Sequence, residues 1–151
     1  MESRLTSILQ DKGAKIYHTT KDATVYECAK RMKELGVGAL MVLHGEKLIG
    51  LISERDIIHK LVSEKREIHD IKVEEIMTQD PLTVLPTTTV AEAMRIVTDK
   101  RFRHLPVVEK GKLLGIISIG DLTRWAMLAQ ANEISSLTDY IHGGPDHSED
   151  K

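Results

Sequence analysis

An internal duplication constrains the fold of this chain more than any other feature of its sequence. Residues 24–57 align without a gap on residues 89–122 at an offset of 65, and 11 of the 34 positions are identical. The positions that recur are Thr24, Val25, Glu27, Leu40, Val42, Lys47, Leu48, Gly50, Ile52, Ser53 and Asp56. Solenoids usually stack three or more repeats, so we expect these two copies to pack face to face.

Each copy shows the same order of hydrophobic periods. Residues 24–35 and 89–100 carry apolar side chains at helical spacing, each led by a threonine suited to an N-cap. Two short apolar runs split by a polar turn with glycine follow, which predicts an antiparallel hairpin. A second helix begins after the hairpin, and a short β-segment precedes the first helix at 15–20 and 82–86. The pattern predicts strand, helix, strand, strand, helix in each copy.

The segments outside the copies predict helices and connections. Residues 4–12 are typical of a short helix that Gly13 ends, residues 62–81 form a charged linker with one helical turn, and residues 130–144 predict a helix closed by two glycines. We expect disorder over 145–151. The predicted units are an N-terminal helix (1–15), a first repeat (16–64), a linker (65–80), a second repeat (81–130), and a C-terminal helix with a disordered tail (131–151).

Composition limits the possible environments and partners. Aromatic residues make up only 3% of the 151 residues, so the core should be aliphatic. The single cysteine, Cys28, excludes an internal disulfide and fits a reducing compartment. Neither a signal peptide nor an apolar run long enough for a membrane span is visible, so we expect a cytoplasmic protein. A net charge of −2 gives no general attraction to nucleic acid or anionic membranes.

A serine and an aspartate recur three positions apart at the end of each hairpin. "GLISERD" contains Ser53 and Asp56, and "GIISIGD" contains Ser118 and Asp121. Past a strand end, where a helix opens, unpaired N–H groups favour an anion, and a carboxylate can accept two hydrogen bonds from a ribose diol. The same spacing also describes a simple helix-capping arrangement. Repetition alone does not decide between these readings, because a duplicated cap would also recur.

A basic cluster distinguishes the second copy from the first. "KRFRH" places Lys100, Arg101, Arg103 and His104 just before a strand, where the first copy has glycine and alanine. This asymmetry indicates a phosphate-binding wall contributed by one copy, and a solvated basic turn at a helix end is the alternative.

The sequence contains no recognisable catalytic or metal-binding motif. The seven histidines lack metal-ligand spacing, cysteine pairs are missing, and neither a P-loop nor a GxSxG elbow occurs. We therefore expect neither an enzyme nor a metalloprotein. A nucleic-acid site would rest only on the basic cluster and Trp125, which is too little to support one.

The paired "GLISERD" and "GIISIGD" segments, "RHLPVVEKGKLLGIIS" and "VEEIMTQDPLTV" together resemble a tandem CBS-domain pair, the Bateman module. The resemblance covers about residues 1–143 and extends to small stand-alone bacterial members of the family. It implies an α/β (α+β) fold of two βαββα repeats related by a pseudo-twofold axis, with extra N- and C-terminal helices, which pairs with a second chain into a flat dimer.

The resemblance also implies a ligand and the residues that would hold it. The family binds adenosine-containing molecules, which points to AMP, ADP, ATP or NAD as ligand, with no catalytic cofactor. The family's ribose-binding aspartate falls on Asp56 and Asp121, its hydroxyl residue on Ser53 and Ser118, and its phosphate-binding residues on Arg103 and His104. The implied adenine positions, and the glycine opposite Arg103, are Thr83, Val84 and Leu105 in the second copy, and His18, Thr19, Leu40 and Gly38 in the first. Because the copies differ at these positions, we expect the two clefts to differ.

From the repeated pair and this resemblance, the sequence predicts a regulatory adenine-nucleotide sensor. It would act as a homodimer, pass its signal to an unidentified effector protein, and bind neither nucleic acid nor membrane. The alternative is a ligand-free scaffold for dimerisation or protein interaction.

Overall fold

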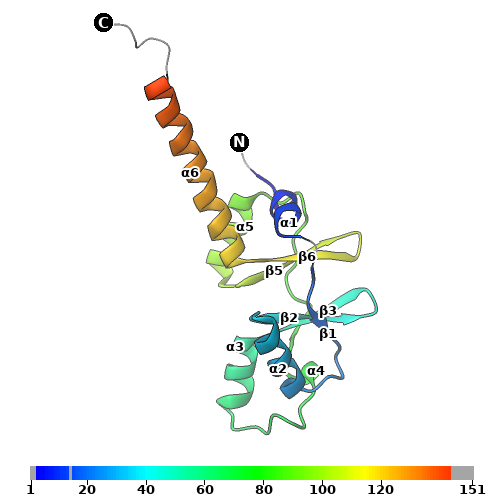
Figure 1. Cartoon of the computed structure of the whole chain (residues 1–151). Coiled ribbons are helices and arrows are strands. Elements are labelled where there is room, and N and C mark those ends of the chain that lie inside the picture. Colours follow the sequence, from blue (N-terminus) through cyan, green and yellow to red (C-terminus); the bar gives the residue numbers. More distant parts are fainter. Residues whose placement is uncertain (1–2, 14, 144–151) are drawn as a thin grey trace, which may run out of the picture.

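The chain folds into two stacked halves in a computed structural model, which describes residues 3–13 and 15–143 (Figure 1). In chain order the elements are α1 Leu5–Lys12, β1 His18–Thr19, α2 Val25–Leu35, β2 Ala39–His44, β3 Lys47–Ser53, α3 Glu54–Ile57, the π-helix η1 Ile58–Val62, α4 Val73–Ile76, β4 Thr78–Gln79, α5 Val90–Lys100, β5 His104–Glu109, β6 Lys112–Ser118 and α6 Ile119–Gly143. This order confirms the predicted α/β fold of two repeats.

The main helix of each repeat begins and ends in the same conformation, but the residue that ends it differs. The Thr24 and Thr89 side chains each accept a hydrogen bond of 3.1 Å, from Glu27 N and Glu92 N respectively, and so cap α2 and α5. Gly36 ends α2 in the left-handed region at φ 69°, where glycine is unstrained. Its counterpart after α5 is Arg101 at φ 58°, a conformation that costs a residue with a side chain roughly 1–2 kcal/mol.

The two hairpins are built in the same register. β2 pairs antiparallel with β3, β5 pairs with β6, and each pairing is irregular at the same position of the repeat. Gly45 and Gly111 take positive φ in the turns, as the sequence predicted. In the first repeat the predicted β-segment at 15–20 contains β1, which joins in parallel beside β2. β4, which joins beside β3, was not predicted. In the second repeat the predicted β-segment at 82–86 makes only a single parallel bridge, between Val84 and Val107.

The lead-in helices α1 and α4 dock crosswise, each on the repeat that does not follow it. In α1, Leu5 N donates to Thr88 O at 2.9 Å, and in α4, Val73 N donates to Ala23 O at 2.8 Å. The reverse bonds also match, because Val90 N donates to Ser3 O and Val25 N donates to Ile71 O, both at 2.8 Å. The repeat residues that accept these bonds, Thr88 and Ala23, are 65 positions apart, and so are the two that donate, Val90 and Val25. The N-terminal helix is therefore a structural part of the second repeat.

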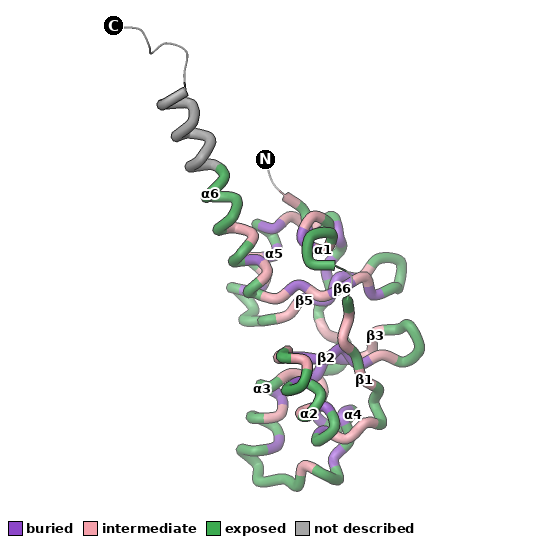
Figure 2. The backbone as a smooth tube through the Cα atoms, viewed as in Figure 1, coloured by how far each residue is buried: buried purple, intermediate pink, exposed green. Residues whose placement is uncertain are grey.

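Buried side chains of the described residues form three clusters. Figure 2 marks the buried positions along the backbone of both repeats. One joins α1 to the second repeat, one joins α4 to the first repeat, and the third lies between the two hairpins around Met41, Leu51 and Leu113. The third cluster fixes one hairpin against the other, which sets the width of any space between the repeats.

The last helix runs without interruption from Ile119 to Gly143, so the helix predicted over 130–144 continues the second helix of the repeat across the domain boundary expected at 130 (Figure 1). The predicted tail at 145–151 lies outside the described residues.

Candidate functional site

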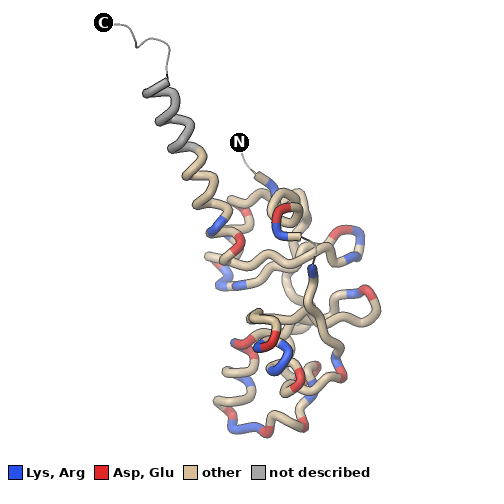
Figure 3. Tube along the Cα trace, viewed as in Figure 1, with Lys and Arg blue, Asp and Glu red and all other residues tan. Residues whose placement is uncertain are grey.

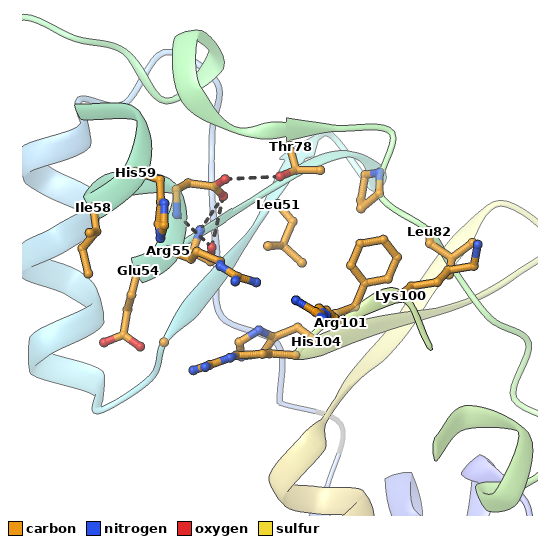
Figure 4. Close-up of a pocket in the computed structure, with 16 residues that line it drawn as sticks. Leu51, Glu54, Arg55, Ile58, His59, Thr78, Leu82, Lys100, Arg101 and His104 are labelled. Carbon is orange, nitrogen blue, oxygen red and sulfur yellow. Dashed lines mark hydrogen bonds between the residues drawn. The ribbon is translucent and has the colours of Figure 1, made fainter. Parts of the chain in front are cut away.

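A cleft of about 570 Å³ opens between the two repeats (Figure 4). The first repeat contributes the end of β3 and the start of α3, the second contributes the turn between α5 and β5, and the linker closes one side. Its lining consists of Gly38, Leu51, Ser53, Glu54, Arg55, Asp56, Ile58, His59, Thr78, Pro81, Leu82, Lys100, Arg101, Phe102, Arg103 and His104. Five of the thirteen predicted site residues therefore line one cleft: Gly38, Ser53, Asp56, Arg103 and His104.

Ser53 and Asp56 form a reciprocal cap at the start of α3. Ser53 N donates to Asp56 Oδ2 at 3.0 Å, and Asp56 N donates to Ser53 Oγ at 3.2 Å. The capping arrangement considered from the sequence is thus present. It also fixes the carboxylate, which is 8% exposed, at the wall of the cleft.

The other oxygen of Asp56 has two further partners. Thr78 Oγ1 donates to Oδ1 at 3.4 Å from β4, as Figure 4 shows, and Lys60 Nζ lies 3.1 Å from the same oxygen. Lys60 also donates to Ile76 O at 3.0 Å and does not line the cleft. The lysine therefore stabilises the buried carboxylate from outside the cleft, while Asp56 itself belongs to the cleft lining.

The wall opposite Asp56 is basic. Lys100, Arg101 and Arg103 lie at the turn into β5, and Arg101 is held there in the left-handed conformation. Figure 3 shows how lysine and arginine are distributed along the two repeats. Together with Arg55, these three wall residues give the cleft four arginine or lysine side chains against two carboxylates, those of Glu54 and Asp56. The local charge therefore favours an anion although the chain as a whole is weakly acidic.

His104 begins β5 at the inner end of this wall, where it pairs with Ser118 of β6. Burial lowers its pKa below the ordinary value of 6.5, and the neighbouring positive charges of Arg103 and Lys12 act in the same direction. The carboxylates of Glu54 and Asp121 oppose this shift. A neutral imidazole in such a position can take up a proton when an anionic group arrives.

Glu54 lies close to Gly38, across from His104 (Figure 4). A Cβ at Gly38 would come within 2.6 Å of Glu54 Oε1, so the missing side chain makes room for this carboxylate. Gly38 is the counterpart of Arg103, and Glu54 is the counterpart of Ile119. The asymmetry between the repeats therefore places charged groups of both signs at this one cleft.

The second serine–aspartate pair has different surroundings. Ser118 N donates to Asp121 Oδ2 at 2.8 Å and Asp121 N donates to Ser118 Oγ at 3.0 Å, which repeats the cap of the first copy. Lys12 Nζ from α1 lies 2.6 Å from the same Oδ2 and donates to Ile116 O at 2.9 Å. Burial raises the pKa of Asp121, but the Lys12 and Ser118 hydrogen bonds and the Lys12 charge outweigh it and hold the pKa below 3.8.

The residues predicted to surround the adenine do not line the described cleft. Leu40, Val84 and Leu105 are buried in the clusters of their own repeats. His18 and Thr83 are exposed, and Thr19 accepts a hydrogen bond from the Cys28 thiol at 3.5 Å. Burial raises the pKa of that thiol, as expected for a cysteine in a core.

Sequence reasoning missed several residues that line the cleft. Phe102, the only phenylalanine of the chain, is 39% exposed there, and Leu82 is 40% exposed beside it. Thr78 comes from the linker, and Pro81 and Leu82 begin the second repeat, ahead of the 34 positions over which the two copies were aligned. The sequence feature that could have indicated them is Leu82, an apolar residue that follows Pro81 and a charged segment.

Among residues 3–13 and 15–132, whose side chains the structure describes, no group of three or more histidine, cysteine, aspartate or glutamate residues is placed to hold a metal ion. None of the helices described there has the length and apolar character needed to cross a membrane.

Comparisons with known proteins agree with this architecture. The CBS-domain family model matches residues 14–63 and 73–128. The chain is 40% identical over 137 residues to the CBS domain-containing protein CBSX3, mitochondrial, of Arabidopsis thaliana, a match that covers 87% of this chain and 66% of the relative. A putative signal-transduction protein with CBS domains from Burkholderia ambifaria has a TM-score of 0.81 at 41% identity, over 85% of this chain and 96% of the other.

A further solved structure is that of CBSX2 in complex with AMP. Its TM-score is 0.70 at 24% identity, over 83% of this chain and 97% of the other, so the likeness shows a shared fold.

Proposed function

The chain belongs to the CBS-domain family as a tandem pair of CBS repeats, and from this premise we propose that it is a regulatory module that binds an adenine nucleotide between its repeats. The observation that carries the proposal is the cleft that joins Asp56 of the first repeat to the basic wall of the second. Binding of AMP by the structural relative CBSX2 supports this choice of ligand.

Each part of a nucleotide has a chemical counterpart in the cleft. The Asp56 carboxylate, held by Ser53, suits the two hydroxyls of a ribose. Arg101, Arg103 and the protonated form of His104 suit phosphate oxygens. The apolar surface of Phe102 and Leu82 suits a purine ring. AMP fits this set, and ADP, ATP and NAD add phosphates that the excess of positive charge favours.

The chemistry of the site is binding rather than catalysis. The resemblance and the geometry support ligand binding as the role of its charged residues, and ligand binding across the two repeats would change how they sit together. We propose that this change is passed to a separate effector protein. A cytoplasmic location stays a prediction, and the Arabidopsis relative is named mitochondrial.

The decisive test is a titration of the full chain with adenosine, AMP, ADP, ATP and NAD by calorimetry. Asp56→Ala removes a charged hydrogen-bond acceptor, worth about 1.5–3 kcal/mol, so affinity for each compound should fall between about tenfold and 150-fold. Asp99→Ala removes an exposed carboxylate of α5 that does not line the cleft, and should bind as the wild type does. Equal affinity of Asp56→Ala and wild type would contradict a ribose site at Asp56.

Arg103→Ala tests the orientation of the ligand. We expect it to weaken AMP, ADP and ATP more than adenosine, because adenosine lacks the phosphate that the guanidinium would contact. Arg95→Ala, on the exposed face of α5 and outside the cleft, is the matched control. Equal losses for all four compounds would remove Arg103 from the phosphate position.

Exposed apolar side chains support a second function, dimerisation. Val62 is 62% exposed and Met127 is 64% exposed, and they occupy the same position in the two repeats. Ile58 and Leu128 lie nearby on the same helices and are also more than half exposed. If no nucleotide bound, this surface would favour a scaffold that only dimerises; if a nucleotide binds, it is the surface through which we expect two modules to pair.

A further inference from the structure

The two serine–aspartate pairs are equally well formed, yet only one of them lines the cleft. Both aspartates have a lysine partner, but Lys60 reaches Asp56 Oδ1 at 3.1 Å from the adjoining helix, whereas the lysine at Asp121 comes from α1. Its last residue, Lys12, places its ammonium 2.6 Å from Asp121 Oδ2 and 2.9 Å from Ile116 O, between a carboxylate and a main-chain carbonyl. The Lys12 and Asp121 side chains are 25% and 15% exposed, so this contact is largely shielded from solvent.

The internal duplication shows which residues of the first repeat correspond to the surroundings of Lys12. The first-repeat counterpart of Ile116 is Leu51, which pairs with Thr78 of β4, and Thr78 also reaches Asp56 at 3.4 Å. The linker therefore turns into a short strand that leaves the Asp56 cleft open. α1 instead continues as a helix to Lys12 and delivers an amine to the equivalent aspartate.

α1 is anchored so that this amine stays in place. Leu5 and Ile8 are buried in the second-repeat cluster, and Leu9 packs on Gly115, where a Cβ would come within 2.6 Å of Leu9 Cδ2. Gly13 then ends the helix directly after Lys12, with its N–H bonded to Leu9 O at 3.0 Å. Because the lysine is held by its own helix, its effective concentration at Asp121 is high.

We propose that Lys12 is a built-in occupant of the ribose position at Asp121, so that the chain holds one nucleotide, at the Asp56 cleft, and none at the equivalent place in the second repeat. This inference rests on the proposed function for the Asp56 cleft. A ribose hydroxyl is a neutral donor, and a neutral hydrogen bond is about half as strong as a charge-assisted one. A ribose would therefore have to displace a stronger, tethered donor and leave an ammonium without its partner.

The test is the number of AMP molecules bound per full-length chain, measured by calorimetry. We expect one for the wild type and two for Lys12→Met, which keeps the length of the side chain but removes the charge. Adding Asp121→Ala to Lys12→Met should return the number to one, and adding Asp56→Ala instead should leave one. Lys15→Met, which removes a nearby lysine that lies over the Tyr17 ring, should stay at one.

Two results would overturn the inference: two AMP molecules on the wild type, or one on Lys12→Met. If the wild type binds no AMP, the proposed function fails separately. In that case a site gained in Lys12→Met and removed by Asp121→Ala still supports the inference, and no gain overturns it. A melting curve for each variant shows whether α1 stays docked, and Lys12→Gln replaces Lys12→Met if the latter does not fold.

Discussion

Asp56 and Asp121 make the same contacts with the serine three residues before them, and differ in the lysine that reaches them. Lys60 approaches Asp56 from its own helix, behind the cleft, whereas Lys12 approaches Asp121 from a helix 109 residues away in sequence. Lys60 contacts Oδ1, the oxygen of Asp56 that the cap does not use, whereas Lys12 contacts Oδ2, the capping oxygen of Asp121.

His104 links the charge of this region to the pH dependence of stability. Its pKa is lowered by burial in the folded chain, while in the unfolded chain it takes up a proton near pH 6.5. The unfolded state therefore binds more protons between the folded pKa and pH 6.5. The contribution of His104 to stability is complete above pH 6.5 and is lost as the pH falls through 6.5 toward the folded pKa.

We expect the free energy of unfolding, measured with urea, to fall more steeply for the wild type than for His104→Gln between about pH 7.5 and about pH 5.5. His44→Gln, at an exposed position in the first hairpin, should keep the slope of the wild type. Identical slopes for all three proteins would show that His104 titrates as freely in the folded chain as in the unfolded one.

At the scale of elements, the crosswise docking of α1 and α4 makes a prediction about stability. Leu5 and Val73 are both 0% exposed and occupy equivalent positions at the starts of these helices. Leu5→Ala should lower the free energy of unfolding by about 2–5 kcal/mol, as expected for a fully buried leucine. Gln10→Ala, on the exposed side of α1, should change it by less than about 0.5 kcal/mol. A loss equally small for Leu5→Ala would mean that α1 is not docked in solution.

The helices, hairpins and turn glycines were predictable because their signals are local. The end of α1 at Gly13 and the caps at Thr24 and Thr89 follow from residues within one turn. Which repeat receives α1 was not predictable in this way, because Leu5 contacts residues more than 80 positions away and its periodicity is the same in either location.

The residues of the candidate site also divide into those with a signal in the sequence and those placed by contacts between distant segments. Asp56, Arg103 and Gly38 were found because the duplication shows where the repeats agree and where they differ. Phe102, Thr78 and Lys12 were missed as site residues. Thr78 reaches Asp56 through the pairing of β4 with β3, and Lys12 reaches Asp121 through the docking of α1 on the second repeat, neither of which has a local sequence signal. The assignment of Leu40, Val84 and Leu105 to the adenine stays a prediction, and in this structure their side chains fill the cores of the repeats.

At the scale of the whole molecule, α3 with η1 and α6 lie on the same side of the two stacked repeats (Figure 1). Val62 and Met127 hold equivalent positions on these helices and are the two most exposed of the large apolar side chains described. Burying a side chain of this kind contributes about 1.5–3 kcal/mol, so a twofold pairing that covers both residues in each chain gains from four of them.

The double variant Val62→Glu/Met127→Glu should therefore sediment as a monomer at concentrations where the wild type is a dimer. Leu85→Glu, which places the same charge at a 57% exposed leucine away from these helices, should remain dimeric. A double variant that still dimerised would move the interface to another face, and a monomeric wild type would leave the nucleotide cleft as a site whose signal is passed on by a single chain.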